Sequence, residues 1–414
     1  MLVRFRRRMH VEWVSLERIG GAGTAAIALA ALVLAGTLTS PARAAGSSLR
    51  YLERAQNPDG GFGGARGQPS SQLLTGWAVI GLEAAGRNPL DVRRRGRSPI
   101  AYIHGHLGQL KDTGDLERTI LALEGAGVDA RHVRGRDLVA ELLRHRRADG
   151  SFERQSNWTA FGVLALRATG RKPRSRVVRR SAGWLAAQQN SDGGFSFATR
   201  GGGSFVDETG AAVQGLAAAG RRHSAVVKGA LGYLRSAQNA DGGFGQSEGY
   251  RSNAQSTSWA VQGIVAAGKD PARFGAKARS PLAFLASLRA ANGSYRYSRS
   301  SVQTPVWVTA QAIAAIRRKA LPLRPVPRRV HRAAAAKPKA KKAHSPVRKA
   351  RRTRASEAAP AAVPRPAPAA KPVSESRSGG GESDGTSPLP AIGAGAAVLV
   401  TLVTARFLSR RRHV

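Results

Sequence analysis

A short polar motif recurs along this chain and constrains its fold more than any other feature. The fullest copy is QNADGGFG, which begins at Gln238. Altered copies begin at Gln56, Arg147, Gln189 and Ala291. Self-similarity at a period of roughly 20 to 50 residues is typical of repeat proteins, in which one unit cannot bury its apolar face alone. The sequence therefore predicts a stack of similar units, either an open solenoid or a closed ring.

Ala-rich apolar segments lie between the motifs and close with a glycine. The glycines are Gly86, Gly127, Gly170, Gly220 and Gly268, and a sixth segment, Val306 to Ile316, lacks one. Each segment is long enough for about three helical turns, and a glycine just past the end is a common helix terminator. A second helix is expected before each of them. The expected starts are near Ser48, Pro99, Asp137, Arg180, Lys228 and Pro281. The chain thus predicts an all-α fold of six helix pairs.

The motif itself is expected to be a structural turn after the first helix of each pair. Its two glycines accept positive φ, its Asp side chain bonds nearby backbone N–H groups, and its aromatic residue covers the gap between pairs. The residues concerned are Asp59, Gly60, Asp149, Asp192, Gly193, Asp241 and Gly242. Calcium binding is the alternative, although a calcium loop alternates several carboxylates and each turn offers one.

The spacing around the motif resembles the QW motif of triterpene cyclases. Tyr51 and Leu52 are followed at this spacing by Gln56, Gly60 and Phe62, and two more near-complete copies begin at Trp184 and Tyr233. The resemblance covers about residues 48 to 318. It implies the α/α toroid of the prenyltransferase and squalene-cyclase superfamily, in which six inner and six outer helices surround a central cavity.

The resemblance also suggests where to look for chemistry. Protein prenyltransferases bind zinc through Asp, Cys and His, and this chain has no Cys, so we expect neither a metal nor another cofactor. Class II terpene cyclases protonate their substrate with the middle Asp of a DxDD motif, and the nearest match here is the stretch Phe205 to Thr209. Asp207, with Glu208, is therefore the candidate catalytic acid. The alternative is an ordinary helix N-cap, because Asn157 occupies the same position in another repeat.

An aromatic column runs through the predicted inner helices, nine residues before their ends. Its aromatic members are Trp77, Phe161, Trp259 and Trp307, with Arg118 and Ala211 in the other two repeats. Around a cavity this column predicts a belt that binds an apolar or planar ligand. The alternative is packing between helices. We expect the functional residues at the ends of the inner helices that lie away from the turns.

The two ends of the chain predict export and anchoring. A basic start, an apolar run and a small-residue site predict a signal peptide at 1–45, or else a retained anchor. The toroid at 46–320 is followed by a basic, disordered Ala/Pro-rich stalk at 321–388, a membrane anchor at 389–408 and a basic cytoplasmic tail at 409–414. Leu389, Pro390 and Gly393 resemble a sortase signal, with Ile392 in the usual Thr position.

Charge and export together limit the partners. With 66 Lys plus Arg against 25 Asp plus Glu, the chain should adhere to anionic membrane or wall polymer, or the stalk is a soluble spacer. We expect no nucleic acid and a monomer. The sequence favours a ligand-binding or interaction module displayed on the cell envelope rather than an enzyme. The alternatives are a terpenoid cyclase or prenyltransferase-like enzyme with Asp207 as general acid, and a structural wall-spanning protein.

Overall fold

The computed structural model describes residues 41–275 and 278–329. These residues form twelve α-helices with three short 3₁₀ turns. The expected signal segment up to residue 40, the anchor and the sortase-like Leu389, Pro390 and Gly393 lie outside the described residues. No helix in 41–275 or 278–329 combines the length and apolar character needed to cross a membrane.

The helices form the six expected pairs, with one inner and one outer member each. The inner helices are α3 (Gln72–Ala84), α5 (Thr113–Gly125), α7 (Ser156–Ala168), α9 (Val206–Ala218), α11 (Ala254–Ala266) and α13 (Pro305–Ile316). The outer helices are α2 (Pro41–Ala55), α4 (Pro99–Gly105), α6 (Leu138–Arg144), α8 (Arg176–Ala186), α10 (Ala225–Ser236) and α12 (Pro281–Ser287). Helices α8 and α10 begin a few residues earlier than expected, and Ser224 caps α10 by accepting from the Val227 N–H.

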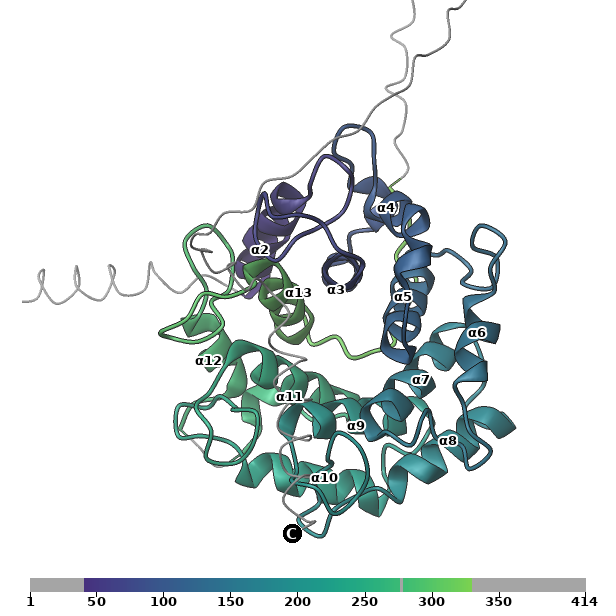
Figure 1. The fold of residues 1–414 in the computed structure, drawn as a ribbon. Helices are drawn as coiled ribbons and strands as arrows, with labels where there is room; N and C mark the ends of the chain where they lie inside the picture. The colour runs from purple at the N-terminus through teal and green to yellow at the C-terminus, as the bar shows by residue number, and fades with distance from the viewer. Residues whose placement is uncertain (1–40, 276–277, 330–414) are drawn as a thin grey trace, which may run out of the picture. The chain divides into compact units, whose positions relative to one another are not determined.

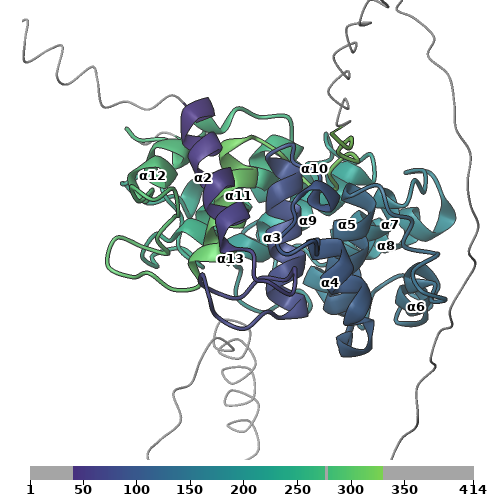
Figure 2. The same cartoon turned by 90° about the horizontal axis from the view of Figure 1, so that it is seen from above.

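The inner helices close into a ring. Each packs against the next in chain order, and α13 packs against both α3 and α2. Figure 1 shows the inner helices around the centre with the outer helices on the outside of this ring, and the view from above shows α2 and α3 beside α13 (Figure 2). The closed ring, rather than an open solenoid, is therefore the fold, and the prediction of an α/α toroid is confirmed.

Each Asp-Gly turn is held by its own side chains. In the first turn, Oδ1 of Asp59 accepts from the Gly61 N–H and from the Ser70 hydroxyl, both at 2.9 Å. Gly60 has φ 93°, and a Cβ there would stand 2.6 Å from the Ser98 carbonyl oxygen. Gly61 does not adopt positive φ, contrary to expectation; it is needed because a Cβ would collide with the Tyr102 ring. The turn thus requires its two glycines for different reasons.

The aromatic residue of the turn fastens it to the inner helix of the same pair. The Phe62 N–H donates to Oγ1 of Thr75 at 2.9 Å, and the Phe62 ring is fully buried. The same bond joins Phe152 to Thr159, Phe195 to Thr209, Phe244 to Thr257 and Tyr295 to Thr309. A buried backbone N–H needs a partner, so the Thr hydroxyl lets the chain turn inward without an unpaired donor. Five of the six pairs share this device.

Neighbouring pairs interlock at the starts of the inner helices. A carbonyl in the loop after each turn accepts from the first N–H of the preceding inner helix. The bonds run from Ser156 to Ala198, Val206 to Gln246, Ala254 to Tyr297 and Val306 to Gly64. Helices α3 and α5 receive no such bond from the next repeat. The side chains of Ser71 and Asp112 cap these helices instead. Their neighbours are the second pair, which has no turn motif, and the third, whose loop is short.

A segment predicted to be stalk is part of the ring. Residues 320–329, which we call the strap, cross from α13 toward α5 (Figure 1). Leu321 is 5% exposed, and the Val326 N–H donates to the Gly125 carbonyl at 2.9 Å. Arg328 and the Arg329 N–H both bond the Asp91 carboxylate. The folded domain therefore extends beyond the boundary expected at residue 320.

Candidate active site

The aromatic column meets at the centre of the ring. Trp77 stacks on Trp307 at 6.3 Å and contacts Trp259 edge-on at 5.7 Å, and Phe161 contacts Trp77 and Trp259 edge-on at 6.2 and 5.5 Å. These are favourable geometries for aromatic pairs. Trp259 is buried, and the other three keep part of their surface exposed. The side chains thus form one cluster that fills the centre, rather than a belt around an open cavity.

The sixth helix is one turn out of the expected register. The Tyr295 N–H bonds Thr309 as the Phe244 N–H bonds Thr257, so Gln311 is the counterpart of Trp259. Trp307 lies one turn nearer the start of its helix and reaches the cluster from there. The alignment failed because α13 does not end on a glycine: Arg318, with φ 52°, adopts the left-handed conformation instead. The spacing from Tyr295 to Thr309 is the signal that would have fixed the register.

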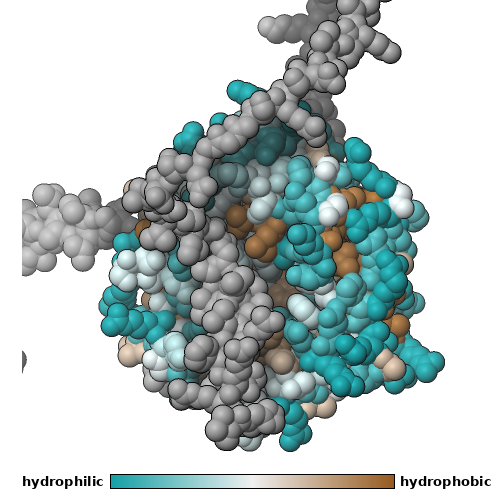
Figure 3. All heavy atoms as spheres, viewed as in Figure 1, coloured by the Kyte–Doolittle hydropathy of each residue, from teal (hydrophilic) through white to brown (hydrophobic). Residues whose placement is uncertain are grey.

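Little space remains inside the ring. A cavity of about 10 Å³, enough for about one water molecule, lies between Trp77, Trp259, Gln311 and Leu321. The inner helices approach closely because glycines face backbone: a Cβ on Gly81 would lie 2.6 Å from Ala310. Leu321 of the strap closes the end where the inner helices finish. In the view of Figure 3, hydrophobic residues show near the centre of the face turned to the viewer, surrounded by hydrophilic ones.

Asp207 and Glu208 lie in the first turn of α9, on its inner side. They precede Ala211 of the column by four and three residues, a spacing that puts them on the same helix face. The N-cap residue is Phe205 and makes no side-chain cap bond, so Asp207 is not the cap. Because Phe195 of the turn bonds Thr209, the acids lie at the same end of the ring as the turns. The expectation that function lies at the opposite end is wrong for these two residues.

The Asp207 carboxyl is incompletely paired. Its Oδ1 is shielded from solvent and has no hydrogen-bond partner, while Ser256 of α11 supplies one side-chain hydrogen bond. Asn253 donates its Nδ2 to the Ser256 hydroxyl at 3.1 Å, which leaves the hydroxyl proton free to point at Asp207. A carboxyl with one satisfied and one bare oxygen can hold or release a proton at the bare one.

Burial changes the charge of the acid pair. Loss of water raises the pKa of Asp207 to about 6. Loss of water, and then the neighbouring Asp207 charge, raises the pKa of Glu208 to about 8. At pH 7 the two carboxyls together therefore keep about one proton. Acids whose pKa values are raised by burial are typical of functional sites.

Two tyrosines border the acid pair. Burial raises the pKa of Tyr297, and the Asp207 charge raises it further. The Tyr233 hydroxyl donates to the Ser204 carbonyl at 2.8 Å, and burial also raises its pKa. Both phenols therefore stay protonated at neutral pH.

The buried charged groups of α3 and α5 lie on helices that do not pack against α9, which carries the acid pair. Arg118, in the aromatic column, is 8% exposed and pairs with Asp115. Burial lowers the pKa of Arg118 and raises that of Glu117 well above its usual value. Glu83 is also buried and unpaired, but it packs against Gly125 between α3 and α5 rather than at the centre. Among the described residues no three His, Asp or Glu side chains gather as a metal site would require.

Sequence reasoning missed Ser256 and Leu321. Ser256 could have been found by placing α9 beside α11, because it lies one residue before Thr257 of the shared Thr column. Leu321 gave no signal, since it follows the last repeat in a basic, Pro-rich stretch. Both residues matter because they contact the acid pair and the central cavity respectively.

Comparison with known proteins decides the family. The family model for the prenyltransferase alpha-alpha toroid domain matches residues 24–286 and 209–319. The chain belongs to this family. The chain also shares 30% identity over 166 residues with drimenyl diphosphate synthase of Streptomyces showdoensis. That alignment covers 34% of this chain and 30% of the relative, so the chain spans about a third of that protein.

Solved structures that align with this chain include two kinds of enzyme. The type II terpene cyclase MstE from Scytonema aligns with 67% of this chain and 97% of its own, at 12% identity and a TM-score of 0.47. A wild-type glycosidase aligns with 69% of this chain and 98% of its own, at 13% identity and a TM-score of 0.48.

Proposed function

We propose that this toroid is a terpenoid-cyclase-type enzyme that protonates an alkene of a prenyl substrate. The reaction takes place at the end of the ring where the inner helices begin and the Asp-Gly turns lie, which we call the mouth. The observation that carries the proposal is the bare Oδ1 of Asp207 on the inner side of α9, next to Glu208, in a carboxyl pair whose pKa values are raised by burial. The likeness to drimenyl diphosphate synthase supports a prenyl diphosphate as substrate class. The cyclase alternative thus replaces the simple ligand-binding module that the sequence favoured.

The proposed reaction is an isomerisation. The carboxylic O–H bond of the pair breaks, a C–H bond forms at one alkene carbon, and the other carbon becomes a carbocation. The π electrons of a second alkene in the chain then form a ring bond. Loss of a proton from carbon to the carboxylate restores the acid, so no co-reactant is needed. Aromatic faces attract cations, and Trp77, Phe161 and Trp307 supply them.

The substrate has to enter from the mouth. The enclosed space of about 10 Å³ cannot hold a prenyl chain, and the strap closes the opposite end. Trp77, Phe161 and Trp307 keep exposed surface on which an apolar chain can lie. Entry of a longer chain requires these side chains to move apart.

Product analysis in heavy water tests the proposal. We would incubate the purified full chain with farnesyl or geranylgeranyl diphosphate, remove the diphosphate with phosphatase, and analyse the alcohols by mass spectrometry. The expected result is a cyclic isomer that gains one deuterium in D₂O. Asp207→Asn should lower the rate by about two to four orders of magnitude, the usual contribution of a general acid.

A control variant, a double variant and a binding measurement distinguish the possible outcomes. Asp129→Asn, at an exposed acid remote from the mouth, should leave the rate unchanged. Unchanged turnover by Asp207→Asn combined with Glu208→Gln would overturn the assignment of the acid. If native mass spectrometry shows a bound prenyl diphosphate but no cyclic product forms, the toroid is a binding module and the enzyme proposal is wrong.

A further inference from the structure

A basic pocket lies on the outer surface of the fifth repeat, apart from the mouth. It has a volume of about 330 Å³ and lies beside the 3₁₀ turn η3 (Pro271–Arg273). Its lining residues are Arg235 of α10 together with Lys269, Asp270, Arg273, Phe274 and Gly275. The Arg235 guanidinium lies over the Phe274 ring at 5.2 Å. Within the described part of the chain, Arg235, Lys269 and Arg273 form no ion pair, and Asp270 already pairs with Arg318 at 3.0 Å.

The first repeat contains a direct counterpart of this pocket. The stretches from Gln56 to Pro99 and from Gln238 to Pro281 align without insertion or deletion. Within that register η1 (Pro89–Asp91) corresponds to η3. The pocket residues Arg235, Lys269, Asp270, Arg273 and Phe274 therefore correspond to Glu53, Arg87, Asn88, Asp91 and Val92.

In the first repeat the counterpart site holds a peptide, namely the strap of the same chain. Asn88 donates its Nδ2 to the Val326 carbonyl at 2.6 Å. Asp91 accepts from Arg328 Nε at 2.5 Å and from the Arg329 N–H at 2.7 Å. Glu53 is neutralised by Arg87 at 3.0 Å. An acidic site thus seats an extended basic segment.

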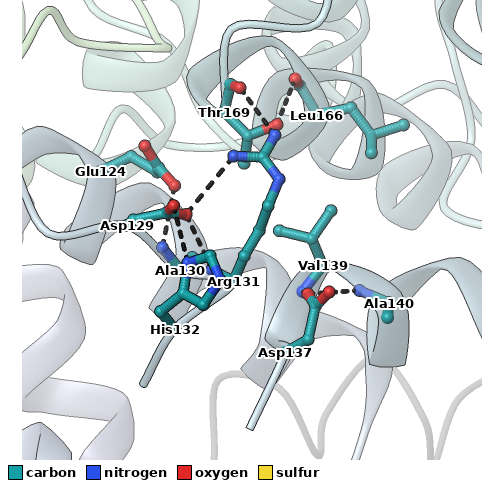
Figure 4. Close-up of polar contacts among 10 residues, drawn as sticks. All are labelled: Glu124, Asp129, Ala130, Arg131, His132, Asp137, Val139, Ala140, Leu166 and Thr169. Carbon is teal, nitrogen blue, oxygen red and sulfur yellow. Dashed lines mark hydrogen bonds and ion pairs between the residues drawn. The ribbon is translucent and has the colours of Figure 1, made fainter.

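The second repeat satisfies the equivalent position by itself. Asp129, the counterpart of Asn88, accepts from the Arg131 N–H at 2.9 Å and contacts the His132 ring at 3.1 Å (Figure 4). Arg131 also donates to the Thr169 carbonyl at 2.9 Å. The charges there are paired within the loop, so the second repeat presents no free group to a ligand at this place.

The fifth repeat reverses the charges of the first. Arg235 and Arg273 stand where Glu53 and Asp91 stand, and Lys269 keeps the positive charge of Arg87. Three like charges line one concave site, which disfavours an empty pocket at low salt and favours an anionic occupant. The strap cannot be that occupant, since it is basic and lies on the first repeat.

We propose that this pocket binds an extended acidic segment of a partner protein. One carboxylate of the segment pairs with Arg273, which is the ion pair of Arg328 with Asp91 with the two charges exchanged, and Arg235 offers a second cation beside it. An extended peptide is favoured because the equivalent site binds backbone as well as side-chain groups of one. The three cations are exposed, so binding weakens steeply as salt is raised.

Photo-crosslinking locates the segment. The probe is a fluorescent peptide in which Glu replaces the three Arg residues of strap residues 324–329, with a photoreactive group at one end. Mixed with the full chain, it should crosslink near residue 235 and to 269–275. The same peptide with Gln in place of Glu should not crosslink there. Crosslinks confined to the basic segment after residue 329, or equal labelling by both peptides, would overturn the proposal.

Charge exchange gives a sharper test. Arg235→Glu with Arg273→Asp should weaken binding of the acidic peptide about tenfold or more, as expected for the loss of several exposed pairs. Arg66→Glu, at an exposed site elsewhere, controls for a charge reversal outside the pocket. Adding Asp270→Asn to the double variant recreates the first-repeat site, and this variant should gain binding of the strap peptide itself. Equal weakening by Arg66→Glu, or no gain by the triple variant, would contradict a specific site.

Discussion

The backbone N–H of Leu321 donates a hydrogen bond of 2.9 Å to Oε1 of Gln214, a fully buried side chain of α9. This bond brings the chain back into the ring after its last helix and places the Leu321 side chain against Trp77 and Trp259. The strap is therefore a packed part of the toroid, and its contacts can be tested one at a time.

Shortening the Leu321 side chain, which packs at the centre of the ring, should lower the free energy of unfolding. Leu321→Ala removes buried methyl groups next to a cavity, and such changes cost about 2 to 5 kcal/mol. Chemical denaturation of the full chain measures the loss. Leu323→Ala, at a partly buried position of the same strap, should cost less. Equal losses for the two variants would mean that Leu321 does not fill the centre.

Neutralising Asp91 should release the far end of the strap. Asp91→Asn weakens the bonds to Arg328 and the Arg329 N–H, so trypsin should cut after these arginines faster than in the parent chain. The bonds to Arg329 and Arg328 lower the pKa of Asp91 against the effect of burial. The stabilisation is thus present above the carboxyl's unfolded pKa and is lost as pH falls through the lower folded value. Equally fast cleavage of the parent chain and of Asp91→Asn at neutral pH would contradict this pairing.

Removing the hydroxyl of one of the buried Thr residues should lower the free energy of unfolding, because a buried backbone N–H then loses its acceptor. Thr257→Val keeps the shape but leaves the buried Phe244 N–H without an acceptor, which costs about 1 to 3 kcal/mol. Thr257→Ser retains the hydroxyl and should recover a good part of that loss. Denaturation midpoints of the two variants decide the matter: similar values would show that the hydroxyl is not needed.

The acid pair should make stability fall with rising pH. The folded-state pKa values of Asp207 and Glu208 are raised to about 6 and about 8, so the stability they contribute is complete below the unfolded values and is lost as pH rises through the folded ones. Melting temperatures from pH 5 to 9 should show this decline. Glu208→Gln should flatten the upper part of it. The melting temperature of Asp129→Asn should fall between pH 5 and 9 as it does in the parent chain, because Asp129 is exposed and its pKa is lowered.

The fold was predictable because the sequence repeats, and the register of a helix was mispredicted where a repeat departs from the pattern. The recurring turns and the glycines that close the inner helices were enough to place the six helix pairs. The register failed in α13, where Arg318 replaces the glycine that ends the other inner helices. The shape of the aromatic column was not predictable for a different reason: whether rings line or fill a cavity depends on how closely helices approach, and that follows from contacts such as Gly81 against Ala310.

The site was only half predictable for a similar reason. Asp207 and Glu208 were visible as an acidic pair near a helix start. Whether the pair caps the helix or holds a proton depends on Ser256, which comes from a helix one repeat away, and on the loop carbonyl of Gln246 that bonds the Val206 N–H instead. Contacts between repeats leave no pattern within one repeat.

The interlock of loop carbonyls with inner-helix N–H groups has a consequence for how the molecule comes apart. A solenoid has two terminal units that can fray, but the bond from Val306 to Gly64 joins the last pair to the first. Every pair then has two neighbours, and opening any one of them exposes both adjoining faces to water. Unfolding should therefore start at the seam with the fewest fasteners, beside α3 and α5, and once begun should run through the whole circle as a single event.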